Sequence, residues 1–385
     1  LLVPNAKGGA SIPLSQNETA MSKANGDVLS MIPQLYDAMP QYFGTQPGTS
    51  GPVYVGAFVL FLFVLGLFIV RTPLKWALLG ATVLSVLLSW GHNFMGFTNF
   101  FLDYVPMYAK FRTVASILVI AEFTIPLLAA LTLKQIIDES SCLAKNMKYV
   151  YVSFGLTAGV ALIMALLPSM MGPFVSGQEQ QMVEGIQGMT PDVQSMILSS
   201  IATMRSAMVS ADAWRSVIII VIGVAMLLLF KVRKLTPVYL IAGLALLCLV
   251  DLWQGDKRYL NDGMFVEKSE RDAPKQPTDV DKIILKDKSL SYRVLNFASG
   301  AFNENNTSYF HKSIGGYHPA KLRRYQEIID KYIVPEMQST MQELAVNSGD
   351  MAAVDGNKTF PILNMLNAKY FILPLQDRAT MQIKN

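Results

Sequence analysis

Charged residues are scarce in this chain of 385 residues. Asp, Glu, Lys and Arg together make up 16% of the sequence, whereas an ordinary soluble domain carries about 25%. Hydrophobic residues account for 52%, and the mean hydropathy is +0.35. This balance is typical of a membrane protein. The net charge of +4 is spread over many loops without the basic stripe that nucleic-acid binding requires, so we expect no nucleic-acid partner.

Cysteine and histidine are rare as well. Cys142 lies in a predicted loop and Cys248 in an apolar run, so we expect no disulfide between them. None of the three histidines stands beside cysteine at zinc-ligand spacing. The absence of a Walker motif, of GxGxxG before a helix and of GxSxG argues against a soluble nucleotide site and acyl transfer. No cofactor or metal site is evident, although a divalent metal could still take part.

The sequence contains long apolar runs. Six of them have roughly the 17–25 apolar residues needed to cross a bilayer core about 30 Å thick. They are about Pro52–Val70, Leu74–Trp90, Thr113–Ile136, Tyr149–Leu167, Trp214–Phe230 and Leu235–Asp251. We therefore predict a mainly α-helical fold in which residues 52–252 form a polytopic transmembrane helix bundle in a lipid bilayer.

Short basic loops predict the orientation of this bundle. Alternate connections carry the positive charge: residues 71–75, the loop with Lys134, Lys145 and Lys148, and residues 231–234. The positive-inside rule places such loops in the cytoplasm. The opening segment 1–51, the loops 91–112 and 168–213, and residues 253–385 are then extracytoplasmic.

Residues 253–385 are richer in charge and contain no further apolar span. The run SYRVLNFA is typical of a strand, and residues 319–333 have the apolar spacing of a helix that begins near Pro319. FPILNMLNAKYFILP indicates a short helix that leads into a strand. We predict a small extracytoplasmic α/β domain. Because the chain begins with Leu1 and ends soon after a strand, we expect it to be part of a longer polypeptide.

The loop 168–213 contains a helical pattern of its own. Thr190 is a suitable N-cap, and Pro191 suits the first helical position. Apolar residues then recur at helical spacing; they are Val193, Met196, Ile197, Ile201, Met204 and Met208. The opposite face has Gln, Ser and one Arg, without the lysines of a membrane-surface helix. We interpret the loop as lid-like, with methionines that give an adaptable surface. A plain structural connector is the alternative.

The interfacial loop 91–112 is dense in aromatic residues. Spacings of 4, 3, 4 and 3 place five rings on one helix face; they are Phe97, Phe101, Tyr104, Tyr108 and Phe111. Pro106 should bend or end this helix. We expect the helix to lie in the membrane interface, with His92 and Asn93 at its start.

Four charged residues near this loop are candidates for a functional role. Lys110 and Arg112 could bind an anionic headgroup, since a guanidinium donates two hydrogen bonds to phosphate, or they could snorkel at a helix end. Asp103 could be a general base, a metal ligand or a solvated carboxylate. Glu122 lies inside a predicted span, where a carboxylate by default marks a functional site, although a structural, hydrogen-bonded glutamate is an equal alternative.

Four longer stretches carry a family resemblance. They are QYFGTQPGTSGPVYVGA (41–57), DLWQGDKRYLND (251–262), RVLNFASGAFNENNTSYFHKSIGGYHPAKLRRYQEIID (293–330) and LNMLNAKYFI (363–372). These stretches resemble motifs of the YfhO-like family of bacterial polytopic membrane proteins, and the resemblance covers nearly the whole chain. The family is placed with the GT-C glycosyltransferases, which take sugar from a polyprenyl-phosphate carrier. Phe43 stands where the family commonly has tryptophan, and it keeps an aromatic ring for stacking on sugar.

The resemblance implies a C-terminal part of a GT-C-type enzyme in the bacterial inner membrane that glycosylates an envelope polymer or lipid. The acidic catalytic residue of such enzymes usually lies in an earlier outer loop, so no catalytic residue is transferred here. We expect Tyr42, Phe43 and His92 to line the sugar or acceptor site. We expect Lys110 and Arg112 to offset the charge of the departing lipid phosphate.

Two other classes of function stay open. An envelope-lipid transporter or flippase would place Glu122 on its pathway, and should show paired broken helices or inverted repeats. A noncatalytic membrane assembly factor would use residues 253–385 to bind partners.

Overall fold

The computed structural model describes all residues except 5, 10, 11, 33, 45–52, 111–113, 140, 187, 319, 320, 348, 349, 376, 377, 384 and 385. The chain forms two compact units, Leu1–Asp262 and Gly263–Asn385. The boundary lies ten residues after the one expected from sequence, and the opening segment belongs to the first unit.

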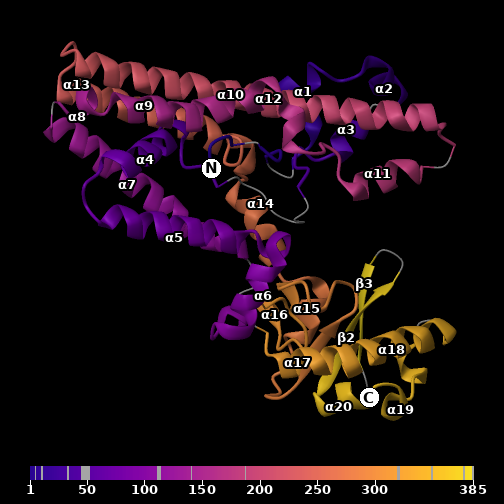
Figure 1. The fold of residues 1–385 in the computed structure, drawn as a ribbon. Coiled ribbons are helices and arrows are strands. Elements are labelled where there is room, and N and C mark those ends of the chain that lie inside the picture. Colours follow the sequence, from indigo (N-terminus) through magenta and orange to yellow (C-terminus); the bar gives the residue numbers. More distant parts are fainter. Residues whose placement is uncertain are drawn as a thin grey trace. The chain divides into compact units, whose positions relative to one another are not determined.

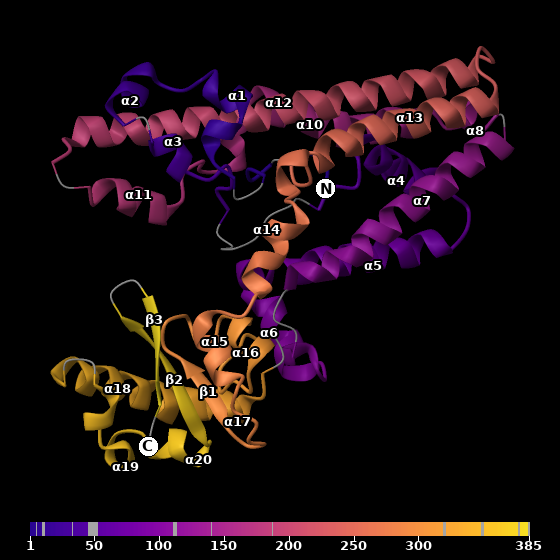
Figure 2. The ribbon, with the colours of Figure 1, turned by 180° about the vertical axis from the view of Figure 1, so that it is seen from behind.

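The first unit is a bundle of apolar helices preceded by a short helical segment (Figure 1). This N-terminal segment, the described part of residues 1–44, contains α1 (Glu18–Met21), α2 (Gly26–Met31) and α3 (Leu35–Ala38). The bundle contains α4 (Ala57–Ile69), α5 (Leu74–Ser89), α6 (Met95–Tyr104), α7 (Val119–Asp138), α8 (Cys142–Lys145), α9 (Met147–Phe154), α10 (Val160–Leu166), α11 (Gly177–Glu184), α12 (Pro191–Lys231) and α13 (Pro237–Asp256). Both views show α10, α12 and α13 side by side, and α5 beside α7 (Figures 1 and 2).

Four helical segments are long and apolar enough to cross a membrane. They are Val114–Asp138, Met147–Leu166, Pro191–Lys231 and Pro237–Asp256, and they coincide with four of the six predicted spans. The other two are shorter: α4 has 13 residues and α5 has 16. A bend of 106° separates α5 from the segment Gly91–Tyr104, and Gly91 at the bend has a φ of +49°, a conformation that glycine adopts readily.

The two ends of the bundle differ in charge. At one end, which we call the basic end, Glu139 forms ion pairs with Arg71 at 3.0 Å and with Lys145 at 3.3 Å. At the other, which we call the pocket end, the Tyr54 hydroxyl before α4 bonds to Asp251 of α13 at 2.8 Å. There Ser210 of α12 also donates to the carbonyl of Ala165 in the last turn of α10.

Residues 191–231 form one continuous helix, and this corrects the prediction of a separate lid in the loop 168–213. The helix begins after Thr190, with Pro191 in its first turn as expected. Its 41 residues span about 62 Å at 1.5 Å per residue, twice the thickness of a bilayer core. No helix-breaking residue lies between the two predicted elements, so the helix does not stop there.

The N-terminal segment covers the apolar face of this helix. Ile197, Ile201, Met204 and Met208 of α12 are buried against a group of residues from the segment; these are Leu14, Ala20, Val28, Leu35, Tyr36 and Met39. The Tyr36 hydroxyl lies 2.7 Å from Ser200 Oγ. Met204 and Met208 are therefore buried in a core, where the sequence suggested an adaptable apolar surface.

Close packing of α4 against α12 depends on Gly223. A Cβ at this position would lie 2.2 Å from the Phe58 ring. We expect Gly223→Ala to lower the free energy of unfolding by about 1–3 kcal/mol, as overpacking does. Gly80 in α5 has no atom within 4 Å of a Cβ, and Gly80→Ala should be neutral or stabilising by up to about 1 kcal/mol. Denaturation in detergent micelles measures both; equal effects would contradict this packing.

The second unit contains three strands among short helices. Its helices are α14 (Lys268–Asp272), α15 (Asp279–Ile284), α16 (Asn306–Phe310), α17 (Arg323–Ile328), α18 (Val334–Val346), α19 (Gly356–Thr359) and α20 (Pro361–Met365). The strands β1 (Arg293–Asn296), β2 (Ala368–Leu375) and β3 (Arg378–Ile383) pair in the order β1-β2-β3. β1 pairs with β2 in parallel, and β2 with β3 in antiparallel.

The strand in SYRVLNFA and the helix-to-strand transition in residues 360–374 are as predicted. The helix expected from Pro319 begins instead at Arg323 and continues through a π-helical turn, Ile329–Ile333, into α18; residue 319 lies outside the described residues. Glu336 of α18 accepts hydrogen bonds from the backbone N–H groups of Ile362 and Leu363 at 2.8 and 2.9 Å. This contact satisfies the first turn of α20.

Candidate functional site

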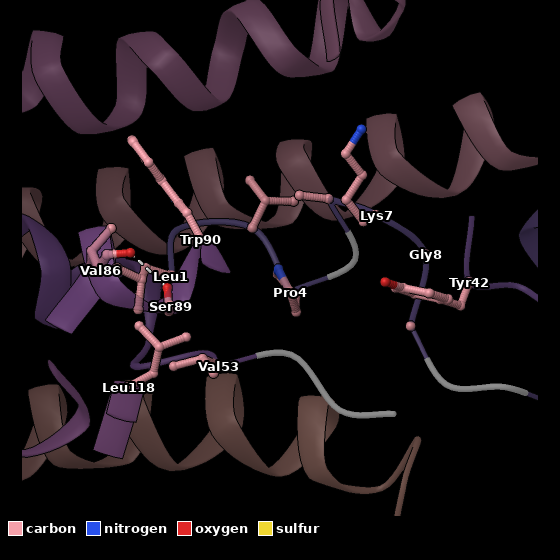
Figure 3. A pocket seen from close by; sticks show the side chains of 13 residues that line it. Leu1, Pro4, Lys7, Gly8, Tyr42, Val53, Val86, Ser89, Trp90 and Leu118 are labelled. Atoms are coloured by element: carbon pink, nitrogen blue, oxygen red, sulfur yellow. Dashed lines mark hydrogen bonds between the residues drawn. The ribbon is translucent and has the colours of Figure 1, made fainter. Parts of the chain in front are cut away.

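Two pockets occupy the pocket end of the first unit, and the N-terminal segment lines both. The first, which we call the aromatic pocket, has a volume of about 330 Å³, within the range of small-molecule sites. It is lined by Leu1, Val3, Pro4, Ala6, Lys7, Gly8, Gly9, Tyr42, Val53, Val86, Ser89, Trp90 and Leu118. Figure 3 shows Tyr42 and Trp90 on opposite sides of it, with the Tyr42 hydroxyl directed towards Pro4.

The aromatic pocket combines rings, aliphatic side chains and few polar groups. Trp90 is the C-cap of α5 and is 49% exposed, while Tyr42 is half-buried. Lys7 has the one charged side chain among the lining residues, and its Nζ lies 5.6 Å from the centre of the Phe43 ring. Aromatic faces and aliphatic walls suit an amphipathic ligand, such as a sugar ring joined to a lipid.

The second pocket, which we call the polar pocket, has a volume of about 460 Å³. It is lined by Ile12, Gln16, Asn17, Glu18, Thr19, Gln41, Met208, Ala211, Asp212, Lys257, Arg258 and Asn261. Amides and both signs of charge dominate this set, and Thr19 adds a hydroxyl group. Such groups donate and accept hydrogen bonds in many directions, which is what a ligand rich in hydroxyl groups needs.

One ion pair dominates the electrostatics of the polar pocket. Arg258 donates two hydrogen bonds of 2.6 Å to the carboxylate of Asp212, the bidentate geometry typical of a strong pair. Burial lowers the pKa of Arg258, but the hydrogen bonds and charge of Asp212 outweigh this effect and hold it above its ordinary value. Arg258 therefore stays ionised, and the ion pair lies at one wall of the pocket.

Asp251 joins three helices at the pocket end. The carboxylate is 1% exposed and accepts hydrogen bonds from the Tyr54 hydroxyl and from the Ala57 N–H in the first turn of α4. Arg215 of α12 donates to the same carboxylate at 2.8 Å and also to the Asp251 carbonyl. Two other guanidinium nitrogens of Arg215, Nε and Nη1, are buried without a partner among the described residues.

The three residues predicted to line a sugar or acceptor site lie in different surroundings. Tyr42 lines the aromatic pocket. Phe43 is a core residue: it is only 5% exposed and packs on Phe174, with ring centroids 5.2 Å apart. The buried guanidinium of Arg205 lies over the Phe43 ring, 5.6 Å from its centre. His92 is exposed in the 3₁₀ turn Gly91–Phe94 and lines neither pocket.

The aromatic loop follows the prediction in part. α6 ends at Tyr104, two residues before Pro106, as expected of a proline. Ring contacts connect Phe97 to Phe101 and Phe101 to Tyr108. Tyr104 departs from the predicted stripe: it packs on Phe100 and is 74% exposed. Phe111 lies outside the described residues.

Two of the four charged candidates, Asp103 and Glu122, have described side chains. Asp103 is exposed on α6. Glu122 is exposed in the first turn of α7, beside the exposed Phe123, and lines neither the aromatic pocket nor the polar pocket. Lys110 ends a 3₁₀ turn, and nothing is described of its side chain. Arg112 lies outside the described residues.

Sequence patterns missed the buried ion pairs. Arg205 was assigned to an exposed polar face, yet its side chain is fully buried and pairs with Glu179. Asp212 and Arg215 lie three residues apart on α12. Asp212 pairs with Arg258 just after α13, and Arg215 pairs with Asp251 within α13. A carboxylate near the end of an apolar run, at Asp251, was the one local signal that could have indicated a partner.

Among the described residues, no group of three or more His, Cys, Asp or Glu side chains is placed so that it could hold a metal ion. No protein-family model, curated protein or solved structure matches the chain. The membrane character therefore rests on the apolar helices themselves.

Proposed function

We propose that this chain is part of a membrane-embedded glycosyltransferase of GT-C type. The enzyme would transfer a sugar from a polyprenyl-phosphate donor to an envelope polymer or lipid on the extracytoplasmic face of a bacterial inner membrane. The resemblance of four sequence stretches to YfhO-like proteins supports this class. The polytopic apolar helices are compatible with a lipid-linked substrate.

The observation that carries the proposal is the composition and place of the aromatic pocket. It lies beside the C-terminal end of α5 and the residues just before α4. Trp90 and Tyr42 lie on opposite sides of it (Figure 3). A lipid-linked sugar has an apolar chain that stays in the bilayer and a polar head at its surface. Rings at a helix end would hold such a head at the interface, where amphipathic aromatic side chains are stable.

The reaction we propose is a direct displacement at the anomeric carbon. An acceptor hydroxyl oxygen forms the new bond to that carbon while the bond to the lipid phosphate oxygen breaks, and the hydroxyl proton passes to a base that we do not assign. The phosphate leaves with an added negative charge. Lys110 and Arg112 are proposed to offset this charge, since preorganised donors of this kind often make the largest contribution to catalysis.

The polar pocket is the proposed place for the acceptor. Its amides, the Thr19 hydroxyl and the Asp212–Arg258 pair would fix a hydroxyl-rich group by hydrogen bonds. Both pockets share the N-terminal segment as one wall, so a single segment would position donor and acceptor.

Trp90→Ala is the test of this function. The full-length protein that contains this chain, purified in nanodiscs and incubated with a polyprenyl-phosphate sugar and an envelope extract, should transfer labelled sugar. We expect Trp90→Ala to lower the transfer rate about fivefold, because an aromatic contact contributes about 1 kcal/mol.

Trp76→Ala is the matched control. Trp76 is 61% exposed near the other end of the same helix, α5, and its removal should leave transfer unchanged. Equal losses in the two variants would contradict a site at the aromatic pocket. Movement of the lipid across the bilayer without any transfer would favour the transporter alternative.

A further inference from the structure

The second unit has a pocket of its own, which we call the lysine pocket. Its volume is about 350 Å³. It is formed by the loop after α15 and by α16, and the two helices lie side by side in both ribbon views (Figures 1 and 2). It is lined by Asp287, Lys288, Ser289, Tyr292, Ser308, Tyr309, Phe310, His311 and Lys312. Nothing in the proposed transfer step uses these residues.

Two lysines of this pocket are held by carbonyl groups and not by carboxylates. The Lys288 ammonium donates to the Leu285 carbonyl at 3.1 Å, and the Lys312 ammonium donates to the Leu290 carbonyl. Neither has an ion-pair partner among the described residues. An ammonium has three donors, so each retains donors for a ligand while its position is fixed by one bond.

The one carboxylate that lines the pocket is already neutralised. Asp287 accepts a hydrogen bond of 2.6 Å from Lys369, another of 2.7 Å from the Tyr370 hydroxyl and one from the Ser289 N–H. The hydrogen bonds from Lys369, Ser289 and Tyr370 hold the pKa of Asp287 well below its ordinary value. Its charge is balanced by Lys369, so the charge left at the pocket is that of the two lysines.

Hydroxyl groups and rings complete the lining. Ser289 and Ser308 provide hydroxyls, and the ring of Tyr309 is 66% exposed. His311 is buried, with Nε2 at 2.8 Å from Asp281 Oδ1, and its Nδ1 has no partner among the described residues. A hydroxyl group both donates and accepts hydrogen bonds, so it could pair with Nδ1 in either role.

We infer that the lysine pocket binds a negatively charged sugar unit, with its phosphate or carboxylate group on Lys288 and Lys312 and its ring against Tyr309. Two unpaired cations select the anion, and an exposed ring beside hydroxyl groups selects a sugar over a free ion. The inference stands on the second unit alone and does not depend on the proposed transferase.

The test is calorimetric titration of the full chain in nanodiscs with four probes: glucose 6-phosphate, glucuronate, glucose and inorganic phosphate. We expect each charged sugar to bind about tenfold more tightly than glucose and than inorganic phosphate. The Lys288→Ala/Lys312→Ala double variant should weaken binding of the charged sugars about tenfold or more. Both positions are exposed, so the fold should tolerate the change.

Lys286→Ala is the matched control, because Lys286 is an exposed lysine two residues away that does not line the pocket; its effect should stay within about twofold. Unchanged binding by the double variant, or equal binding of glucose, would overturn the inference. Binding of inorganic phosphate as tight as that of the charged sugars would overturn its sugar component. Absence of measurable binding by either charged sugar would also overturn it.

Discussion

Arg205→Met is expected to lower the free energy of unfolding of the first unit by about 3–5 kcal/mol, the usual result of removing one member of a buried ion pair. The side chain is fully buried. It donates to both oxygens of the Glu179 carboxylate at 2.6 and 2.9 Å. It also donates to the carbonyls of Phe174 and Pro40 at 2.8 and 2.6 Å.

These four bonds explain the size of the effect. They connect α12 to α11, to the loop before α11 and to the end of the N-terminal segment. Methionine would fill most of the volume but would leave the Glu179 carboxylate and two carbonyls without their donors. Lysine would keep the charge but not the bidentate geometry. Arg205→Lys should therefore lower the free energy of unfolding by less than Arg205→Met does.

The same pair predicts a loss of stability in acid. Burial alone would raise the pKa of Glu179, but the hydrogen bonds from Arg205 and Ser176 and the charge of Arg205 outweigh it and lower the pKa below its ordinary value. A carboxylate whose pKa is lower in the folded state contributes stability that is complete above its unfolded pKa of about 4.3. That contribution is lost as the pH falls below this value towards the folded pKa, and Glu179→Gln should remove this pH dependence.

Chemical denaturation in detergent micelles measures the free energies, and hydrogen exchange locates the change. Faster exchange should concentrate in residues 12–41 and 174–184, which the guanidinium holds in place. Thr203→Ala is the control, since Thr203 is exposed two residues away on the same helix and should change stability by less than about 0.5 kcal/mol. A similar stability for Arg205→Met and Thr203→Ala would contradict this account.

The membrane character of the chain could be predicted from the sequence because it depends on local composition. Runs such as residues 149–167 are apolar along their whole length, and an apolar run of that length favours a helix in any bilayer. The ends of helices also follow local rules: Pro191 stands in the first turn of α12, and α6 ends before Pro106. Such rules involve neighbours a few residues apart.

The pockets and ion pairs could not be predicted, because they depend on contacts between distant residues. Phe43 was expected to contact sugar, but whether an aromatic ring faces a pocket or a core depends on what packs over it, here Phe174 and Arg205. The continuous helix α12 was missed for a related reason. Its N-terminal half has a moderate apolar stripe whose covering layer, residues 14–39, lies more than 150 positions away in the sequence.

Asp251→Ala is also expected to lower the free energy of unfolding of the first unit by about 3–5 kcal/mol. The substitution would remove the acceptor for the Ala57 N–H, for the Tyr54 hydroxyl and for the Arg215 guanidinium. Arg215 has only 15% of its side chain exposed and already has two nitrogens without a partner among the described residues. Without Asp251 its charge would be left buried and uncompensated.

A double-mutant cycle separates this charge effect from a simple loss of packing. If the cost of Asp251→Ala comes mainly from stranding the Arg215 charge, then Asp251→Ala/Arg215→Met should be more stable than Asp251→Ala alone, since removing both members of a buried pair is often nearly neutral. We expect the double variant to recover about 1–3 kcal/mol. The remaining deficit would measure the contacts to Tyr54 and to the start of α4.

The cycle is measured by denaturation in detergent micelles, with transfer activity as a second reading. Strictly additive losses would show that the two side chains do not depend on each other and would contradict the junction described for α4, α12 and α13. Recovery of stability without recovery of sugar transfer would have a different meaning. It would indicate that sugar transfer needs Asp251, Arg215 or both in addition to the stability that the pair supplies.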